Sequence, residues 1–166
     1  MIAAVVLAAG AATRFGEPKQ RLLLPEVLGR LTETSVADIV VVGGAYELDP
    51  GGARAVACPD WEHGPGASLR CGLGALTAET EAAVVCLADG PRLAPEAVER
   101  TIAAWREGDA TVVAASYSGV RGHPVVIGRG AWPAVPDEGM RALPALLVPC
   151  DDLGHPGDVD TPEDLS

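Results

Sequence analysis

Uninterrupted apolar runs recur along the chain, and longer stretches in which apolar residues return at helical spacing separate them. The runs lack the strict alternation of apolar and polar residues that a half-exposed strand shows, so they predict strands buried on both faces. Such strands are typical of parallel sheets that carry helices on both sides. The strands predicted in this way are residues 2–9, 38–44, 53–59, 82–91 and 109–117.

The stretches between these strands predict helices at residues 21–34, 66–78 and 94–108. Pro25 is expected in the first turn of the first helix, where its missing N–H group costs little. In the third helix Pro95 stands at the start and Gly108 follows the end, which is the usual order of proline and glycine around a helix.

The region after Tyr117 departs from this regular alternation. Residues 119–129 predict a turn followed by a short strand, and residues 137–147 predict a short helix. The whole pattern predicts a three-layer α/β/α fold with a mostly parallel, Rossmann-like sheet. A length of 166 residues suits a single domain spanning 1–166. In sheets of this kind, ligands bind at the carboxyl ends of the strands.

The charge balance limits the partners, because 12 Lys and Arg stand against 23 Asp and Glu, for a formal net charge of −11. Nucleic acids and anionic membranes both require a basic surface, so neither is expected as a partner. The apolar run at residues 2–9 is too short to span a membrane and lacks the basic leading region of a secretory signal. The 4 cysteines form no CxxC pair, and we expect free thiols in a cytoplasmic protein.

The segment "VVLAAGAATRFGEPKQ" at residues 5–20 places a turn of small residues after the first strand, followed by Arg14 and Lys19. It is neither a GxGxxG fingerprint nor a P-loop, because the glycines are spaced differently and Lys19 does not follow a glycine. Backbone N–H groups of such a turn can bind phosphate oxygens. The residues alone leave two interpretations open, a phosphate-binding loop or a solvated loop with two surface cations.

This segment resembles the opening signature of the MobA/MocA-like NTP transferase family, which includes the molybdenum-cofactor nucleotidyltransferases. Further segments resemble that family in the same order: "CPDWEHGPGASLRCGL", "CLADGPRL", "GVRGHPVVIGR", "DEGMRALP" and "DVDTPEDL". Together these ordered matches cover most of the chain and are far more specific than any one of them. The resemblance implies the nucleotide-diphospho-sugar transferase-like form of the Rossmann-like fold.

The resemblance also implies a Mg²⁺-dependent nucleotidyltransferase that moves CMP or GMP from CTP or GTP to a small phosphorylated acceptor and releases pyrophosphate. The favoured acceptor is a molybdopterin-type cofactor, with a protein of molybdoenzyme maturation as a partner. Arg14 and Lys19 would be the catalytic residues, because cations stabilise the charge that develops on the phosphates. Two alternatives remain: a sugar phosphate or other small phosphate as acceptor, or a nucleotide-binding regulatory module without turnover.

By the same resemblance, Asp89 and Asp160 would hold Mg²⁺, which prefers carboxylate oxygens. Each has a structural alternative, since Asp89 could begin a turn and Asp160 could cap a helix. The implied nucleotide-binding residues are Leu7, Ala8, Ala9, Gly10, Ser68 and Gly72. The implied acceptor-binding residues are Gly122, His123 and Pro124, of which the histidine could equally be structural.

The chain departs from the family pattern close to these positions. After Lys19 it runs almost directly into a helix, so a loop of the family is shortened. Gly90 stands where the family has Gln, and Cys58 stands where it has Asn. These differences leave the nucleotide, the acceptor and turnover itself open.

Overall fold

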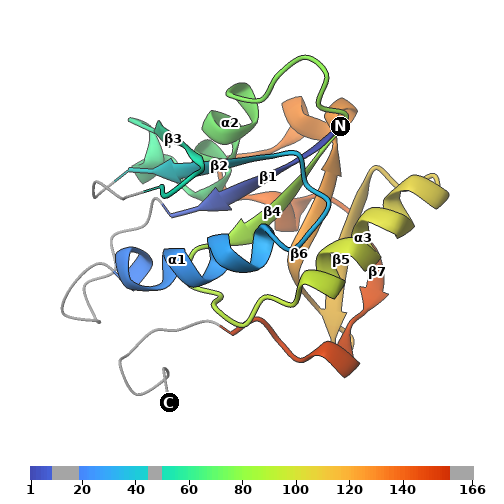
Figure 1. Ribbon diagram of the computed structural model, residues 1–166. Helices are drawn as coiled ribbons and strands as arrows, with labels where there is room; N and C mark the ends of the chain where they lie inside the picture. The colour runs from blue at the N-terminus through green and yellow to red at the C-terminus, as the bar shows by residue number, and fades with distance from the viewer. Residues whose placement is uncertain (9–18, 45–49, 158–166) are drawn as a thin grey trace.

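The computed structural model describes residues 1–8, 19–44 and 50–157, which form a seven-stranded sheet with helices on both faces (Figure 1). The strands are β1 (Ile2–Leu7), β2 (Asp38–Gly43), β3 (Arg54–Ala57), β4 (Ala82–Leu87), β5 (Val112–Tyr117), β6 (Val120–Gly128) and β7 (Leu146–Pro149). Their order is β3-β2-β1-β4-β6-β5-β7. Every neighbouring pair is parallel except those of β6, which runs antiparallel to β4 and β5. The predicted mostly parallel α/β architecture is confirmed.

The helices form the two outer layers of the fold. Helices α1 (Lys19–Leu31) and α3 (Pro95–Glu107) cover one face of the sheet, and α2 (Pro65–Gly74) covers the other (Figure 1). Short 3-10 turns complete the connections: η1 (Trp61–His63), η2 (Arg129–Ala134), η3 (Met140–Ala142) and η4 (Asp151–Leu153). Within the described residues, no helix is both long enough and apolar enough to span a bilayer.

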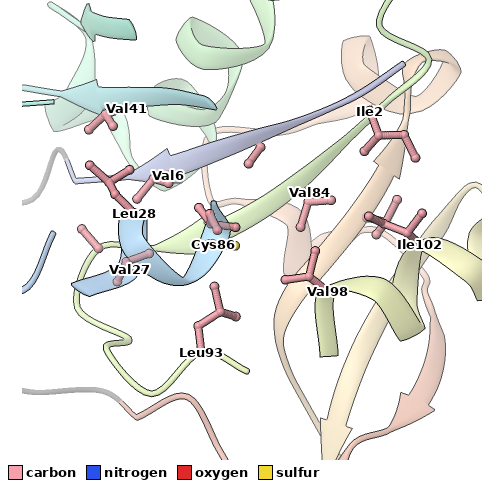
Figure 2. Packing of buried hydrophobic residues seen from close by; sticks show 14 of the residues in the cluster. Ile2, Val6, Val27, Leu28, Val41, Val84, Cys86, Leu93, Val98 and Ile102 are labelled. Atoms are coloured by element: carbon pink, nitrogen blue, oxygen red, sulfur yellow. The ribbon is translucent and has the colours of Figure 1, made fainter. Parts of the chain in front are cut away.

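The central strands are buried on both faces, as their uninterrupted apolar sequences predict. In β4, Val84 belongs to the cluster beneath α1 and α3, whereas the next residue, Val85, belongs to the cluster beneath α2. Figure 2 shows Val27 of α1 and Val98 of α3 in the first of these clusters. Because successive side chains of a strand point to opposite faces, one strand supplies both cores.

The order in which successive strands are added to the sheet reverses at β1. The chain moves from β1 to β2 and β3 on one side, and then returns to place β4 on the other side of β1. Ligands of open α/β sheets bind in the crevice outside the carboxyl ends of the strands at such a switch point. The carboxyl ends of β1 and β4, at Leu7 and Leu87, therefore mark where a site is expected.

Strand β6 is longer than the short strand predicted for this region, and a bulge interrupts it. Its pairing with β5 shifts register between Ala114 and Ser116, so Gly122, His123 and Pro124 lie opposite the single residue Ala115. Its pairing with β4 ends at Val125. Residues 122–124 are therefore released from both neighbours at the carboxyl edge of the sheet. Bulges occur preferentially where a side chain is redirected, often beside active sites.

The helix predicted at residues 137–147 is wrong. The structure has the short turn η3 there, followed by the edge strand β7. Pro144 explains the difference, because a proline drives the preceding residue out of helical conformation. Leu143 is indeed extended, with φ −95° and ψ 132°. Pro25 was also misplaced: α1 begins at Lys19, so this proline lies inside the helix rather than in its first turn.

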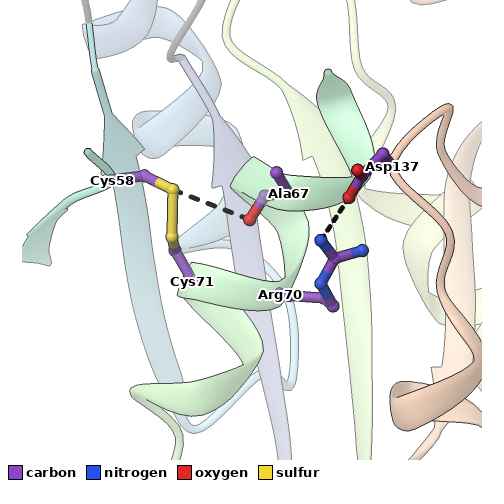
Figure 3. The surroundings of a disulfide bond; sticks show 5 residues. All are labelled: Cys58, Ala67, Arg70, Cys71 and Asp137. Carbon is purple, nitrogen blue, oxygen red and sulfur yellow. Dashed lines mark hydrogen bonds and ion pairs between the residues drawn. A yellow bond between two sulfur atoms is a disulfide. The ribbon is translucent and has the colours of Figure 1, made fainter. Parts of the chain in front are cut away.

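The expectation of free thiols is wrong for two of the cysteines. Cys58 and Cys71 form a disulfide, with their Cα atoms 5.8 Å apart, whereas Cys86 and Cys150 are free and buried (Figure 3). The pair escapes a search for CxxC because 13 positions separate the two residues. The two cysteines meet because α2 packs back over β3, the strand that precedes it in the chain.

Candidate functional site

A pair of adjoining cavities lies at the carboxyl edge of the sheet, where β4 and β6 part. The first has a volume of about 230 Å³ and is bounded by α2 and by the segment around η3. The second has a volume of about 150 Å³ and is bounded by the turn after β4 and by residues 155–157. The residues that line both cavities are Leu87, Arg121, Gly122, His123 and Arg141. The bulge of β6 thus forms the partition between two halves of one site.

Basic side chains gather around this partition in an otherwise acidic protein. Arg121, His123 and Arg141 line both cavities, and His155 lines the second. Burial, together with the neighbouring Arg141, lowers the pKa of Arg121. Glu138 also lines the first cavity, so its walls are not uniformly positive. Convergent cations that are not matched by as many carboxylates favour an anionic ligand.

Arg121 is fixed by backbone carbonyl groups. Its Nη1 donates to the carbonyl O of Leu143 at 2.6 Å, and its Nη2 donates to the carbonyl O of Met140 at 2.9 Å. These bonds tie the start of β6 to η3 and so place Arg141 beside the partition. Among the described residues, Arg141 itself is exposed and makes no ion pair, which leaves its guanidinium available to a ligand.

His123 is held by its backbone, and its imidazole is neutral. The Tyr117 hydroxyl donates to the carbonyl O of His123 at 2.8 Å, and the Tyr117 ring makes an edge contact with His155 at 4.9 Å between centroids. Burial lowers the pKa of His123 from 6.5 to about 4; Asp89 opposes this shift, whereas Arg141, Arg121 and His155 add to it. A neutral imidazole at this point can donate one hydrogen bond and accept another.

Acid should therefore destabilise the folded protein through His123. In the window between pH 6.5 and about 4, the unfolded chain binds a proton at this residue and the folded chain does not. The free energy of unfolding then falls as the pH falls through this window, and the contribution is complete above it. In metal-free urea titrations from neutral pH to pH 4.5, we expect His123→Gln to show a shallower fall than the wild type.

The exposed His63 in η1 offers a matched control for that measurement. His63→Gln makes the same chemical change at the protein surface. Parallel curves for the wild type and His123→Gln would show that His123 does not contribute.

Asp89 lies in the turn that follows β4, half-buried and close enough to His123 to act on its pKa. The C-terminal segment passes beside this turn, because Arg92 N donates to the carbonyl O of Pro156 at 2.8 Å. A Cβ on Gly90 would lie 3.4 Å from the carbonyl O of Gly157, so a small residue suits this crossing. Asp160 follows three positions after Gly157, outside the described residues.

The donor set fits a metal that is bound jointly with a ligand. In the described part of the chain, no group of three or more His, Cys, Asp and Glu side chains could hold an ion. Mg²⁺ requires only one or two protein carboxylates when phosphates and waters supply its other oxygens. Asp89 lies in the turn whose residues Leu87 and Gly90 line the second cavity, and it could supply one such carboxylate. Among the described residues, a site made only of protein ligands would lack donors there.

The wall formed by α2 is set by close backbone contacts. Gly66 N donates to the carbonyl O of Asp137 at 2.9 Å, and a Cβ on Gly66 would lie only 1.6 Å from the carbonyl O of Pro136. Arg70 of α2 forms an ion pair with Asp137 (Figure 3), and its Nη1 donates to the carbonyl O of Val135 at 2.7 Å. Residues 135–139 are therefore pressed against the first turns of α2.

The sequence-predicted nucleotide residues that are described lie on or beside this wall. Leu7 lines the first cavity, and Ala8 is buried, with its N–H donating to the carbonyl O of Val42 at 2.9 Å. Ser68 is 4% exposed in the second turn of α2. Gly72 packs against the sheet, where a Cβ would lie 2.6 Å from Val5 Cγ1, so packing already requires a glycine there.

The predicted acceptor residues are brought together in the bulge of β6. Gly122 and His123 line both cavities, and Pro124 is buried behind them with a cis peptide bond to His123. A Cβ on Gly122 would lie 3.0 Å from the Tyr117 ring. The remaining predicted site residues lie outside the described part of the chain: Ala9, Gly10, Arg14, Asp160 and the side chain of Lys19.

Sequence reasoning did not single out three residues that line the cavities. Arg121 and Arg141 stand inside the quoted segments "GVRGHPVVIGR" and "DEGMRALP", so the signal was present, but no role was assigned to them. His155 carries no motif, and only the packing of the C-terminal segment against Tyr117 places it at the second cavity.

Comparison with known proteins gives both a family and solved relatives. The model of the MobA-like NTP transferase domain matches residues 4–147. No curated protein matches the chain. The crystal structure of Rv0371c from Mycobacterium tuberculosis H37Rv is similar, with 28% identity, a TM-score of 0.83, and coverage of 99% of this chain and 94% of that chain.

Two further structures are informative. The manganese complex of Rv0371c from Mycobacterium tuberculosis H37Rv has 26% identity and a TM-score of 0.79, over 99% of this chain and 95% of that chain. CMP:2-keto-3-deoxy-manno-octonic acid synthetase complexed with CTP has 14% identity and a TM-score of 0.72, over 99% of this chain and 95% of that chain. At that identity the likeness concerns the fold alone, and it agrees with the predicted nucleotide-diphospho-sugar transferase-like architecture.

Proposed function

Because the chain belongs to the family of MobA-like NTP transferase domains, we propose that it transfers CMP or GMP from CTP or GTP to a small phosphorylated acceptor. Pyrophosphate is the other product. We propose a molybdopterin-type cofactor as the acceptor, which would place the protein beside a partner in molybdoenzyme maturation. Residues 1–166 would act as a single domain, in the cytoplasm.

The observation that carries this proposal is the divided cavity at the carboxyl ends of β1 and β4. One half borders α2, where the sequence expects the nucleotide, and the other half borders the turn that carries Asp89. The partition between them bears Arg121, His123 and Arg141. Because both halves share Arg121 and Arg141, two anionic substrates could bind side by side there, and nucleotidyl transfer requires that they be held in contact.

The proposed chemistry depends on position and charge. Arg14 and Lys19 would hold the triphosphate and stabilise the charge that grows as pyrophosphate leaves. Asp89 and Asp160 would hold Mg²⁺, which supplies further positive charge to the phosphate oxygens when it is bound. The acceptor phosphate needs no general base, because its oxygen is already anionic, so a neutral His123 suits a positioning role.

On the acceptor side, Arg141 is the described cation best placed to bind a phosphate. Arg121 is committed to two carbonyl groups, whereas Arg141 is exposed at the edge of both cavities. A guanidinium recognises phosphate through a planar pair of donors. His123 would add a hydrogen bond from the partition.

The direct test is pyrophosphate release from each of the four NTPs with Mg²⁺, with and without molybdopterin and with a panel of sugar phosphates. Release that requires both CTP or GTP and molybdopterin would support the proposal in full. Release with a sugar phosphate instead would reject the molybdopterin acceptor. Nucleotide binding without release under any condition would reject turnover.

Arg141→Gln should raise the KM for the acceptor about tenfold or more, because a hydrogen bond to a charged group contributes about 1.5–3 kcal/mol. The KM for the NTP should rise less, because Arg14 and Lys19 would hold the triphosphate whereas Arg141 would bind the acceptor phosphate. Initial rates with each substrate varied in turn will measure both constants. Arg106→Gln is the control, since Arg106 is exposed in the last turn of α3. An unchanged acceptor KM would exclude Arg141 from recognition.

A further inference from the structure

The disulfide between Cys58 and Cys71 closes a loop around the nucleotide side of the proposed site. The loop contains η1, Gly64 and the first turns of α2, including Ser68. Pro65 and Leu69, within the same loop, line the first cavity. One covalent bond therefore closes a loop that contains the first turns of α2, and residues 72–74 lie beyond it.

The two ends of this loop are attached to different parts of the molecule. Cys58 N donates to the carbonyl O of Gly43 at 2.8 Å, and Trp61 packs on Gly44, where a Cβ would lie 2.5 Å from Trp61 Cγ. These contacts hold η1 to the end of β2. On the other side, the ion pair of Arg70 with Asp137 holds α2 to residues 135–139. The disulfide is the covalent link between the two attachments.

The two cysteines differ in exposure. Cys58 is only 1% exposed, whereas Cys71 is partly exposed on α2. An incoming thiolate would therefore approach the disulfide from the Cys71 side. Reduction by a dithiol begins with attack on Cys71 Sγ, which breaks the S–S bond and leaves Cys58 with the electron pair and a proton. The second thiol of the reductant then releases Cys71 as a thiol, and the reductant leaves as its own disulfide.

The reduced state is accommodated at Cys58. Its Sγ lies 3.6 Å from the carbonyl O of Ala67, so a Cys58 thiol can donate a hydrogen bond to that oxygen. The remaining contacts of α2 do not involve sulfur: Gly72 still packs on Val5, and Arg70 still pairs with Asp137. Reduction should thus loosen the loop without unfolding the protein.

We propose that Cys58 and Cys71 form a redox-modification site that controls nucleotide affinity, with tight binding in the disulfide form and weaker binding in the dithiol form. The proposal rests on the proposed function, because it assigns the α2 wall to the NTP. Thioredoxin-like dithiol proteins are the class of reductant that would act on it in a cytoplasmic setting. The link preorganises the wall, and preorganisation strengthens binding by lowering the cost of ordering.

The expected change in the Kd of the NTP follows from the fraction of time for which the loop is ordered. If reduction leaves the wall in its binding arrangement for about one tenth of the time, the apparent Kd of the NTP rises about tenfold. Cys86 and Cys150 should not take part, because both are buried, and burial raises the pKa of the Cys86 thiol to about 12.

The experiment compares the oxidised protein with protein reduced by dithiothreitol and kept under argon. Calorimetric titration with CTP and with GTP gives the Kd, and thiol titration in denaturant should count two free thiols before reduction and four after it. The double variant Cys58→Ser/Cys71→Ser should bind weakly whether or not reductant is present. Cys86→Ala/Cys150→Ala keeps the disulfide and should respond to reductant as the wild type does.

The outcomes separate the two proposals. Weaker binding after reduction, absent in the double serine variant, supports redox control. Equal Kd values for the oxidised and reduced forms, or four free thiols in protein exposed to oxidised glutathione, would overturn redox control but leave the nucleotidyltransferase proposal intact. If the oxidised protein binds no NTP, both proposals fail.

Discussion

Asp89→Asn is expected to lower kcat for nucleotidyl transfer by about 100-fold or more, the size that follows loss of one strong electrostatic contribution to the transition state. The amide keeps the shape of the carboxylate but removes its charge. Mg²⁺ would then be held by phosphates and by Asp160 alone, and its position relative to the acceptor would be less fixed. The fold should be unaffected, because the turn that carries Asp89 is held by backbone hydrogen bonds of Gly90 and Arg92.

The measurement is pyrophosphate release as a function of Mg²⁺ concentration, joined by calorimetric titration of the NTP-bound protein with Mg²⁺. Both the activating concentration and the Kd of Mg²⁺ should rise in Asp89→Asn. Asp109→Asn provides the same chemical change in an exposed carboxylate beyond α3 and should behave as the wild type. If Asp89→Asn keeps the wild-type dependence on Mg²⁺, Asp89 does not bind the metal and serves only in the turn.

Gly66→Ala is expected to be the most destabilising single-methyl substitution in the α2 wall. The added Cβ would lie 1.6 Å from the carbonyl O of Pro136 and 2.6 Å from its carbonyl carbon, and both are backbone atoms that cannot rotate away. The first turn of α2 and residues 135–139 must therefore separate. Overpacking of this severity costs about 3 kcal/mol or more. For a domain of this size, the melting temperature would fall by roughly 6–12 °C.

Gly74→Ala is the matched control, because it adds the same methyl group to the same helix where no atom lies within 4 Å. Its free energy of unfolding should stay unchanged or rise by up to about 1 kcal/mol, since alanine favours a helix more than glycine does. Thermal melts and urea titrations of both variants will measure the difference. A Gly66→Ala protein as stable as Gly74→Ala would show that the wall is not packed in this way.

The fold was predictable because uninterrupted apolar runs of this length form few structures other than central strands of a sheet that is covered on both faces. The runs at residues 2–9, 38–44 and 82–91 became β1, β2 and β4 respectively, with only their ends misjudged, and β1 lies between the other two in the sheet. The candidate acceptor residues were named only as members of a motif, and their role stays a prediction. Their arrangement was not predictable, because the bulge of β6 results from two pairings with different neighbours, and neither pairing is visible in the local sequence.

Two errors have the same kind of cause, a contact between distant residues. Apolar residues in 137–147 recur at a spacing that suits a helix, but Pro144 and the pairing of β7 with β5 impose an extended chain. The disulfide depends on where α2 returns over the sheet, which the separation of Cys58 and Cys71 does not reveal. His155 was missed for this reason as well, since only tertiary packing places it at the second cavity.

The contact between α2 and residues 135–139 also bears on how proteins built in this way diverge. Backbone atoms of Gly66, Pro136 and Asp137 make part of this contact, and that part does not depend on which side chains surround it. Those side chains can therefore be substituted without moving the backbone atoms that make this contact beside the first cavity. New substrate preference is then most accessible through the partition, where Arg121, His123 and Arg141 present their side chains to both cavities. Under the proposed function, substitutions in the partition would change the acceptor while the backbone contacts of the wall keep the nucleotide side in place.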